Sequence, residues 1–174
     1  MKPCTTLVQE EANKWVYENA AIKVADLLDA KVLAPKLRQP DLDEIQAAVG
    51  IPPEESLYES IKLSREKYSV WSLDESEIYG TFGVVPVPKS KGGIVWFLGS
   101  DDLFDNSKVS FLRNSHFWVD KMMEKYEILF NAVDCRNTVH IRWLKWLGFT
   151  FTEVIEEFGY EKRPFRKFFK RKEE

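Results

Sequence analysis

The spacing of apolar residues changes its period along the chain. Over the first third, apolar positions recur every three or four residues, which predicts a helix that ends before Pro35. The positions that carry this stripe are Ala12, Val16, Ala20, Val24 and Leu27, flanked by Trp15 and Ile22. A second helix is expected from Asp41, because Asp41 followed by Glu44 resembles a capping box.

Two proline and glycine positions divide the next part of the chain. Gly50 and the Pro52-Pro53 pair are expected to end the second helix, and residues 54–63 predict one more short helix. From Tyr68 the pattern becomes rich in β-branched and aromatic residues. Residues 68–73 and 78–87, joined by an acidic turn, predict an antiparallel hairpin.

The last half of the chain alternates between buried strands and helices. A strand at 94–98 is expected to be covered on both faces, and a strand at 128–133 follows it. Helices are predicted at 111–126 and 139–147, the second closed by Gly148, and a hairpin over residues 150–158 and 164–169 is predicted to end the chain.

These elements predict an α/β (α+β) fold: a mixed, mainly antiparallel sheet flanked by helices on both faces. We expect one domain over residues 1–174, with a mainly helical part at 1–66 and a sheet part at 67–174.

Composition narrows the class of protein. Of 174 residues, 44% are hydrophobic and 14% aromatic, which is typical of a packed globular chain. The net charge of −3 gives no electrostatic support for binding nucleic acid or an anionic membrane. Cys4 and Cys135 have no motif spacing, so reduced thiols are expected. We also expect no signal peptide and no membrane span.

Several common site motifs are missing from the sequence. It has no Walker loop, no nucleophile elbow and no Cys/His spacing for zinc, so no metal is expected. The histidines His116 and His140 fall on separate predicted helices, where a lone histidine is more often structural than catalytic.

Residues 137–149 form the sharpest local motif, since Asn137 opens a helix and Gly148-Phe149 ends it. Ordinary helix capping explains this pattern by itself. In the order strand, helix, strand and Asn-started helix, however, the stretch resembles the cofactor-binding half of the GNAT (Gcn5-related N-acetyltransferase) fold. The resemblance implies that acetyl-CoA lies between splayed parallel strands at 94–99 and 127–133. The cofactor-binding residues that it implies are Phe97, Leu98, Gly99, Ser107, Lys108 and Asn137.

Three blocks, 95–101, 120–126 and 137–145, resemble a family of GNAT-like internal virion or head-assembly proteins of short-tailed phages. This resemblance implies a protein made in the host bacterial cytoplasm, working there or in the virion, with a phage or host protein as partner.

The sequence departs from an active acetyltransferase at two places. The loop at 101–110 lacks the glycines that let backbone N–H groups approach a pyrophosphate, and it carries three aspartates. Leu144 stands where many family members have a general-acid tyrosine, and leucine cannot donate a proton. The catalytic candidates that remain are Glu77, Tyr79 and His140, and for each a structural role is the simpler interpretation.

The segment from Lys162 to Lys172 is basic and interleaved with aromatics. It fits either a terminal strand with a charged edge or a contact to nucleic acid, and the acidic balance of the rest favours the strand. Three functions therefore stay open: an acyl-CoA-dependent N-acyltransferase acting on a host or phage amine, a non-catalytic assembly or host-binding factor, and a nucleic-acid-binding module.

Overall fold

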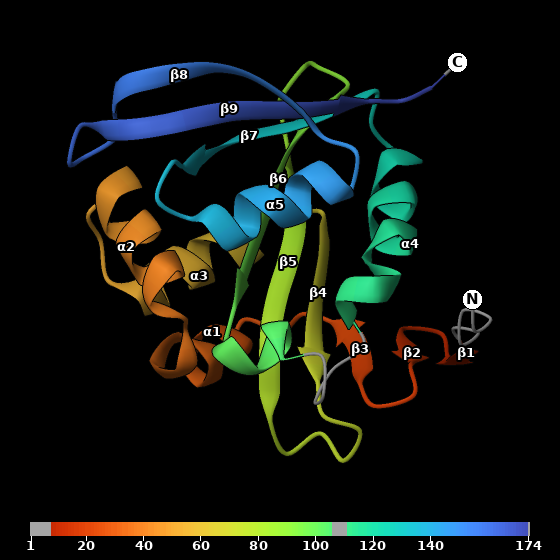
Figure 1. Cartoon of the computed structure of the whole chain (residues 1–174). Coiled ribbons are helices and arrows are strands. Elements are labelled where there is room, and N and C mark those ends of the chain that lie inside the picture. Colours follow the sequence, from red (N-terminus) through yellow and green to blue (C-terminus); the bar gives the residue numbers. More distant parts are fainter. Residues whose placement is uncertain (1–7, 106–110, 174) are drawn as a thin grey trace.

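The computed structural model describes residues 8–105 and 111–173, and for residues 8–11 the backbone alone. Its centre is a nine-stranded sheet in the order β1-β2-β3-β4-β5-β6-β7-β9-β8 (Figure 1). The strands are β1 (Val8–Glu11), β2 (Lys14–Val16), β3 (Ala21–Val24), β4 (Glu66–Trp71), β5 (Ile78–Pro86), β6 (Gly92–Gly99), β7 (Ile128–Asp134), β8 (Thr150–Phe158) and β9 (Arg163–Arg171). The helices are α1 (Asp29–Leu33), α2 (Gln39–Ala48), α3 (Pro53–Leu63), α4 (Phe111–Met123) and α5 (Thr138–Trp146), with short 3₁₀ turns η1 (Ala34–Lys36) and η2 (Asp101–Phe104).

Every neighbouring pair of strands is antiparallel except β6 and β7, which run parallel. A parallel pair needs a crossover connection, and the chain between β6 and β7 contains helix α4. The sequence prediction of a mixed, mainly antiparallel sheet is therefore confirmed.

Helices pack on both faces of this sheet. Because Phe82 pairs with Phe97 and Thr81 with Leu98, alternate residues of β5 and β6 point to opposite faces. On one face, Phe82 and Phe97 pack with Trp118 of α4 and other residues of α4 and α5. On the other face, Leu98 packs with residues of α1, α2 and α3. In Figure 1 these three helices gather at one side of the view and α4 at the other.

The N-terminal prediction is wrong in its secondary structure, because residues 12–27 contain strands β2 and β3 instead of a helix. Trp15 and Tyr17 are buried and Val16 is only half-buried, which is the period of a strand. Ile22 pairs with both Trp15 and Val70, so this segment gains its burial by extending the sheet.

The predicted capping box is also wrong. Helix α2 begins at Gln39, its N-cap residue is Arg38, and no side chain caps it. Asp41 lies inside the first turn and is buried. The end of this helix is as predicted, since Gly50 follows it with a φ of 65°, a conformation that favours glycine.

The later elements agree with the sequence prediction. The hairpin β4–β5, helix α3, the run β6–α4–β7–α5 and the hairpin β8–β9 all form, and Gly148 after α5 has a φ of 84°. None of the helices in the described ranges is long and apolar enough to cross a bilayer.

Candidate functional site

The gap between β6 and β7 is the main irregularity of the sheet. The two strands pair only from Gly92–Ile128 to Ile94–Phe130. Just beyond, the Asn131 Nδ2 donates a hydrogen bond of 2.8 Å to the backbone oxygen of Val95, in place of a backbone–backbone ladder. The strands then separate, as the sequence resemblance implied for this pair.

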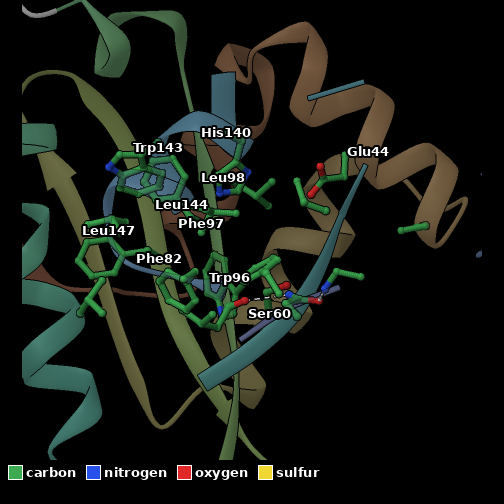
Figure 2. A pocket seen from close by; sticks show the side chains of 18 of the residues that line it. Glu44, Ser60, Phe82, Trp96, Phe97, Leu98, His140, Trp143, Leu144 and Leu147 are labelled. Atoms are coloured by element: carbon green, nitrogen blue, oxygen red, sulfur yellow. Dashed lines mark hydrogen bonds between the residues drawn. The ribbon is translucent and has the colours of Figure 1, made fainter. Parts of the chain in front are cut away.

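A cavity of about 300 Å³ lies in this gap. Its lining comes from both faces of the sheet: Glu44 and Ser60 contribute from α2 and α3, and Trp143 and Leu147 from α5 and its end (Figure 2). Most of the lining is apolar. The titratable side chains among the described lining residues are Glu44 and His140 alone.

Aromatic rings crowd the α4–α5 side of the cavity around Phe97. The ring centroid of Phe97 lies 4.7 Å from that of Trp143, 6.0 Å from that of His140 and 6.3 Å from that of Phe111. The Trp143 indole also donates a 3.0 Å hydrogen bond to the Ser115 Oγ. This bond ties α5 to α4 directly across the region between them.

A buried polar network lies at the C-terminal end of β6. The Arg38 Nη2 donates to the Asp41 Oδ1 at 2.6 Å and to the Asn137 Oδ1 at 3.2 Å. The Asn137 Nδ2 donates in turn to the Asp41 Oδ1 at 3.3 Å and to the Glu44 Oε2 at 3.2 Å. The Gly99 N–H donates to the Asp41 Oδ2 at 2.9 Å. Below we call Arg38, Asp41, Glu44 and Asn137 the α2–α5 network.

The side chains of Arg38 and Asp41 are 4% and 1% exposed, so their ion pair is almost fully withdrawn from water. Burying an ion pair is costly unless further hydrogen bonds offset the loss of water. Asn137 and the Gly99 N–H supply two such bonds, and the Arg38 Nε has no partner among the described residues. The Arg38 guanidinium also lies 4.2 Å from the centre of the Phe104 ring, a cation–π distance.

Electrostatics leave both titratable lining groups uncharged near neutral pH. Burial, and then the negative charge of Asp41, raise the pKa of Glu44 to about 8. Burial lowers the pKa of His140 to about 4. The His140 Nδ1 is buried and has no hydrogen-bond partner in the described part of the chain.

The predicted cofactor residues separate into three groups. Phe97 and Leu98 line the cavity, Phe97 from the α4–α5 face of the sheet and Leu98 from the α1–α3 face. Asn137 does not line the cavity, because its amide bonds within the α2–α5 network, and the Gly99 N–H donates to Asp41. Ser107 and Lys108 lie outside the described residues.

The catalytic candidates are not brought together. Glu77 is exposed in the β4–β5 turn, where its backbone bonds to Ser72. Tyr79 is a buried core residue that does not line the cavity. Only His140 lines it, and Leu144, at the position of the family's general acid, is buried beside it.

Arg38 is the residue of this region that the sequence prediction missed. Asp41 and Glu44 were interpreted as caps. Arg38 is only three positions before Asp41, but their common partner Asn137 is more than ninety positions away, so no local motif marks the network.

The β8–β9 turn docks on the end of α2. The N–H groups of Tyr160 and Glu161 donate to the backbone oxygens of Ala48 and Ala47 at 3.1 and 3.0 Å. Gly159 has a φ of 70°, and a Cβ there would lie 2.6 Å from both of these oxygens. Only glycine allows this close approach, which holds the C-terminal hairpin against the N-terminal helices.

The basic C-terminal segment is strand β9, paired with β7 and β8 over its length. Phe165 and Phe168 are buried, and Lys167 and Arg163 form ion pairs with Glu153 and Glu161 at 2.7 and 2.9 Å. The prediction of a terminal strand with a packed apolar side is confirmed, but the predicted exposed edge is wrong, because β9 lies between β7 and β8 and the edge strand is β8. No group of three or more His, Cys, Asp or Glu side chains suited to a metal occurs among the described residues.

Comparison with known proteins gives two kinds of similarity. Residues 78–158 match the family model described as Bacteriophage T7, probable scaffold protein Gp13. The probable scaffold protein gp13 of Escherichia phage T7 is 40% identical over 71 residues, which cover 39% of this chain and 51% of that protein. The match thus spans about half the length of the phage protein.

Solved structures show similarity over nearly the whole chain. A GNAT-family acetyltransferase from Bacillus anthracis has a TM-score of 0.63 at 8% identity, covering 90% of this chain and 96% of that one. The ribosomal-protein-S5-alanine acetyltransferase from Vibrio fischeri has a TM-score of 0.63 at 14% identity, covering 91% and 96%. Spermidine N-acetyltransferase from Vibrio cholerae, solved with CoA and spermine, has a TM-score of 0.62 at 10% identity, covering 89% and 96%. The chain therefore has the GNAT fold.

Proposed function

We propose that this chain is a GNAT-fold phage protein that acts in virion assembly without using acyl-CoA. The main observation that supports this proposal is the α2–α5 network. In it the Asn137 amide and the Gly99 N–H, two groups that the fold family would offer to the cofactor, bind Arg38 and Asp41 instead.

The other residues of the gap also fit acyl-CoA poorly. The Phe97, His140 and Trp143 rings occupy the α5 side, and Trp143 is bonded to Ser115 of α4. A pantetheine arm that bonds to the Asn137 side chain would have to replace the hydrogen bonds that its amide makes to Arg38, Asp41 and Glu44. The aspartates of η2 add repulsion toward a diphosphate.

The similarity to a probable phage scaffold protein supports the assembly role. A scaffold acts through its surface and its stability, so the network would serve to hold the N-terminal helices on the sheet. On this proposal residues 8–173 work as one unit, in the host cytoplasm or within the particle, with phage proteins as partners.

The experiment is disruption of the coding gene in its phage, followed by mass spectrometry of purified particles and an infectivity titre. We expect particles that lack a component or fail to infect. As matched variants, Glu77→Gln and Tyr79→Phe should support normal particles, because neither catalytic candidate lies at the cavity. Normal, fully infectious particles after disruption would overturn the assembly role.

A second candidate, an N-acyltransferase that acts on a host or phage amine, is supported by the separation of β6 and β7 after Ile94 and Phe130. It requires acetyl-CoA to bind where the Asn137 amide and the Gly99 N–H are already paired with Arg38 and Asp41. Catalysis would be established by transfer of radiolabelled acetyl to a protein of infected cells that is lost in Asn137→Ala.

A further inference from the structure

The cavity between β6 and β7 has a mainly apolar lining, and the proposed assembly role assigns no ligand to it. Several of its polar side chains bond to the protein itself: Trp143 to Ser115, Asn131 to Val95 and the Ser60 hydroxyl to the Ser56 carbonyl. No lysine or arginine is among the described lining residues. The described lining therefore offers an anion no positively charged side chain.

The two ionisable lining groups do not change this conclusion. Burial keeps His140 neutral, with a pKa of about 4, and Glu44 protonated, with a pKa of about 8. A charged guest would lose its hydration and find no countercharge, which makes its entry strongly unfavourable.

The size of the cavity suits a small organic guest. Its volume of about 300 Å³ is at the lower end of ligand pockets. Apolar cavities of roughly half that size, ~150 Å³, already bind benzene in proteins. The surrounding rings of Phe82, Phe97 and Trp118 are buried and packed against one another, so the walls are rigid.

The lining residue His140 has a ring nitrogen without a hydrogen-bond partner among the described residues. The His140 Nδ1 is buried and unpartnered among the described residues, and His140 is only 6% exposed. An unsatisfied buried nitrogen costs free energy that a guest recovers if it supplies the partner. A neutral imidazole carries its proton on one nitrogen, and in the tautomer with the proton on Nε2 the Nδ1 accepts a hydrogen bond from a donor such as a hydroxyl group.

We propose that this cavity is a binding site for a small, uncharged, mainly aromatic or aliphatic molecule that carries one hydroxyl group, held by a hydrogen bond to the His140 Nδ1. The site lies outside the assembly role, and it requires no acyl-CoA and no group transfer.

The test compares para-cresol with toluene, which have the same shape apart from the hydroxyl. Calorimetric titration of the full chain should give one saturable site, with para-cresol binding about tenfold more tightly because one neutral hydrogen bond is added. In His140→Phe the imidazole is replaced by an apolar ring, so this preference should disappear.

A second measurement does not depend on a variant that folds. The chain has 2 histidines, so their imidazole nitrogens give few and separable NMR signals. Para-cresol should shift the His140 nitrogen signals and leave those of His116 unchanged, because the His116 ring packs against Trp146 and does not line the cavity. Toluene has no hydroxyl group, so it should not cause the hydrogen-bond shift of the His140 nitrogen signals.

Two results would overturn the proposal. One is the lack of saturable binding of para-cresol and of any His140 shift at millimolar concentration. The other is equal affinity for para-cresol and toluene in the unmodified chain.

Discussion

The side chains of Arg38 and Asn137 lie 99 positions apart in the sequence and meet in a hydrogen bond of 3.2 Å inside the protein. Arg38 precedes helix α2 and Asn137 precedes helix α5. The bond therefore joins the N-terminal helices to the strand–helix unit that carries the family resemblance. Because both residues are buried, the bond is shielded from water and sensitive to the loss of either partner.

Replacing Asn137 with alanine should destabilise the fold by about 2 kcal/mol, since it leaves Arg38 short of an acceptor and Glu44 short of a donor in a buried site. Urea denaturation followed by tryptophan fluorescence measures this change. The exposed Asn13→Ala is the matched control and should cost less than about 0.5 kcal/mol. Equal losses for the two variants would contradict the role of the network.

The Arg38–Asp41 ion pair should show strong coupling in a double-mutant cycle. Arg38→Met or Asp41→Leu alone leaves one buried charge unpaired and should cost about 3–5 kcal/mol, whereas the double variant should cost less than the sum. Denaturation of all four proteins gives the coupling energy. The exposed pair Lys167–Glu153 is the control, with coupling expected below about 1 kcal/mol. Additive losses at Arg38 and Asp41 would mean that the two charges act independently.

Glu44 should make the stability fall as the pH rises. Its pKa is raised from 4.5 to about 8 by burial and by Asp41, so the folded state holds a proton that the unfolded state releases first. Its contribution is complete below pH 4.5 and is lost progressively up to about pH 8. Glu44→Gln stays uncharged and keeps an oxygen to accept from Asn137 and the Asp134 N–H.

Denaturation at several pH values tests this expectation. Relative to the unmodified chain, Glu44→Gln should gain stability from pH 5 to pH 8. The exposed Glu55→Gln should follow the unmodified chain. If the difference between Glu44→Gln and the unmodified chain stays constant with pH, Glu44 is ionised throughout and the stated environment of its carboxyl group is wrong.

Gly159→Ala should break the contact between the β8–β9 turn and helix α2. A Cβ at this position would lie 2.6 Å from two backbone oxygens, and its φ of 70° is unfavourable for alanine. We expect a loss above about 2 kcal/mol by urea denaturation. Gly148→Ala has an equally unfavourable φ, but its Cβ would meet only the Nζ of the Lys170 side chain, at 3.3 Å, so about 1 kcal/mol is expected. A similar loss for both would show that the close approach at Gly159 is unimportant.

The elements that the sequence predicted are those with one dominant period. The continuous apolar run of β6 predicts a strand and the apolar stripe of α4 predicts a helix. The ends of α2 and α5 are predicted because Gly50 and Gly148 follow them and adopt positive φ angles. The helix prediction for residues 12–27 was wrong because the apolar residues there fit both a helical and a strand period. The segment forms strands because it pairs with the rest of the sheet, as Ile22 does with Val70. The site residues that the resemblance implied stay predictions, and the structure adds contacts that the sequence did not show. Asn137 bonds to Arg38 and Asp41, 99 and 96 positions away, and such tertiary contacts leave no trace in local spacing.

The most direct test is a calorimetric titration of the purified chain with acetyl-CoA. Because Asn137 and the Gly99 N–H are held by Arg38 and Asp41, we predict heats no larger than those of dilution up to millimolar ligand. Saturable one-site binding of acetyl-CoA that CoA abolishes by competition would contradict the proposal of a protein that does not use acyl-CoA, and would favour an N-acyltransferase.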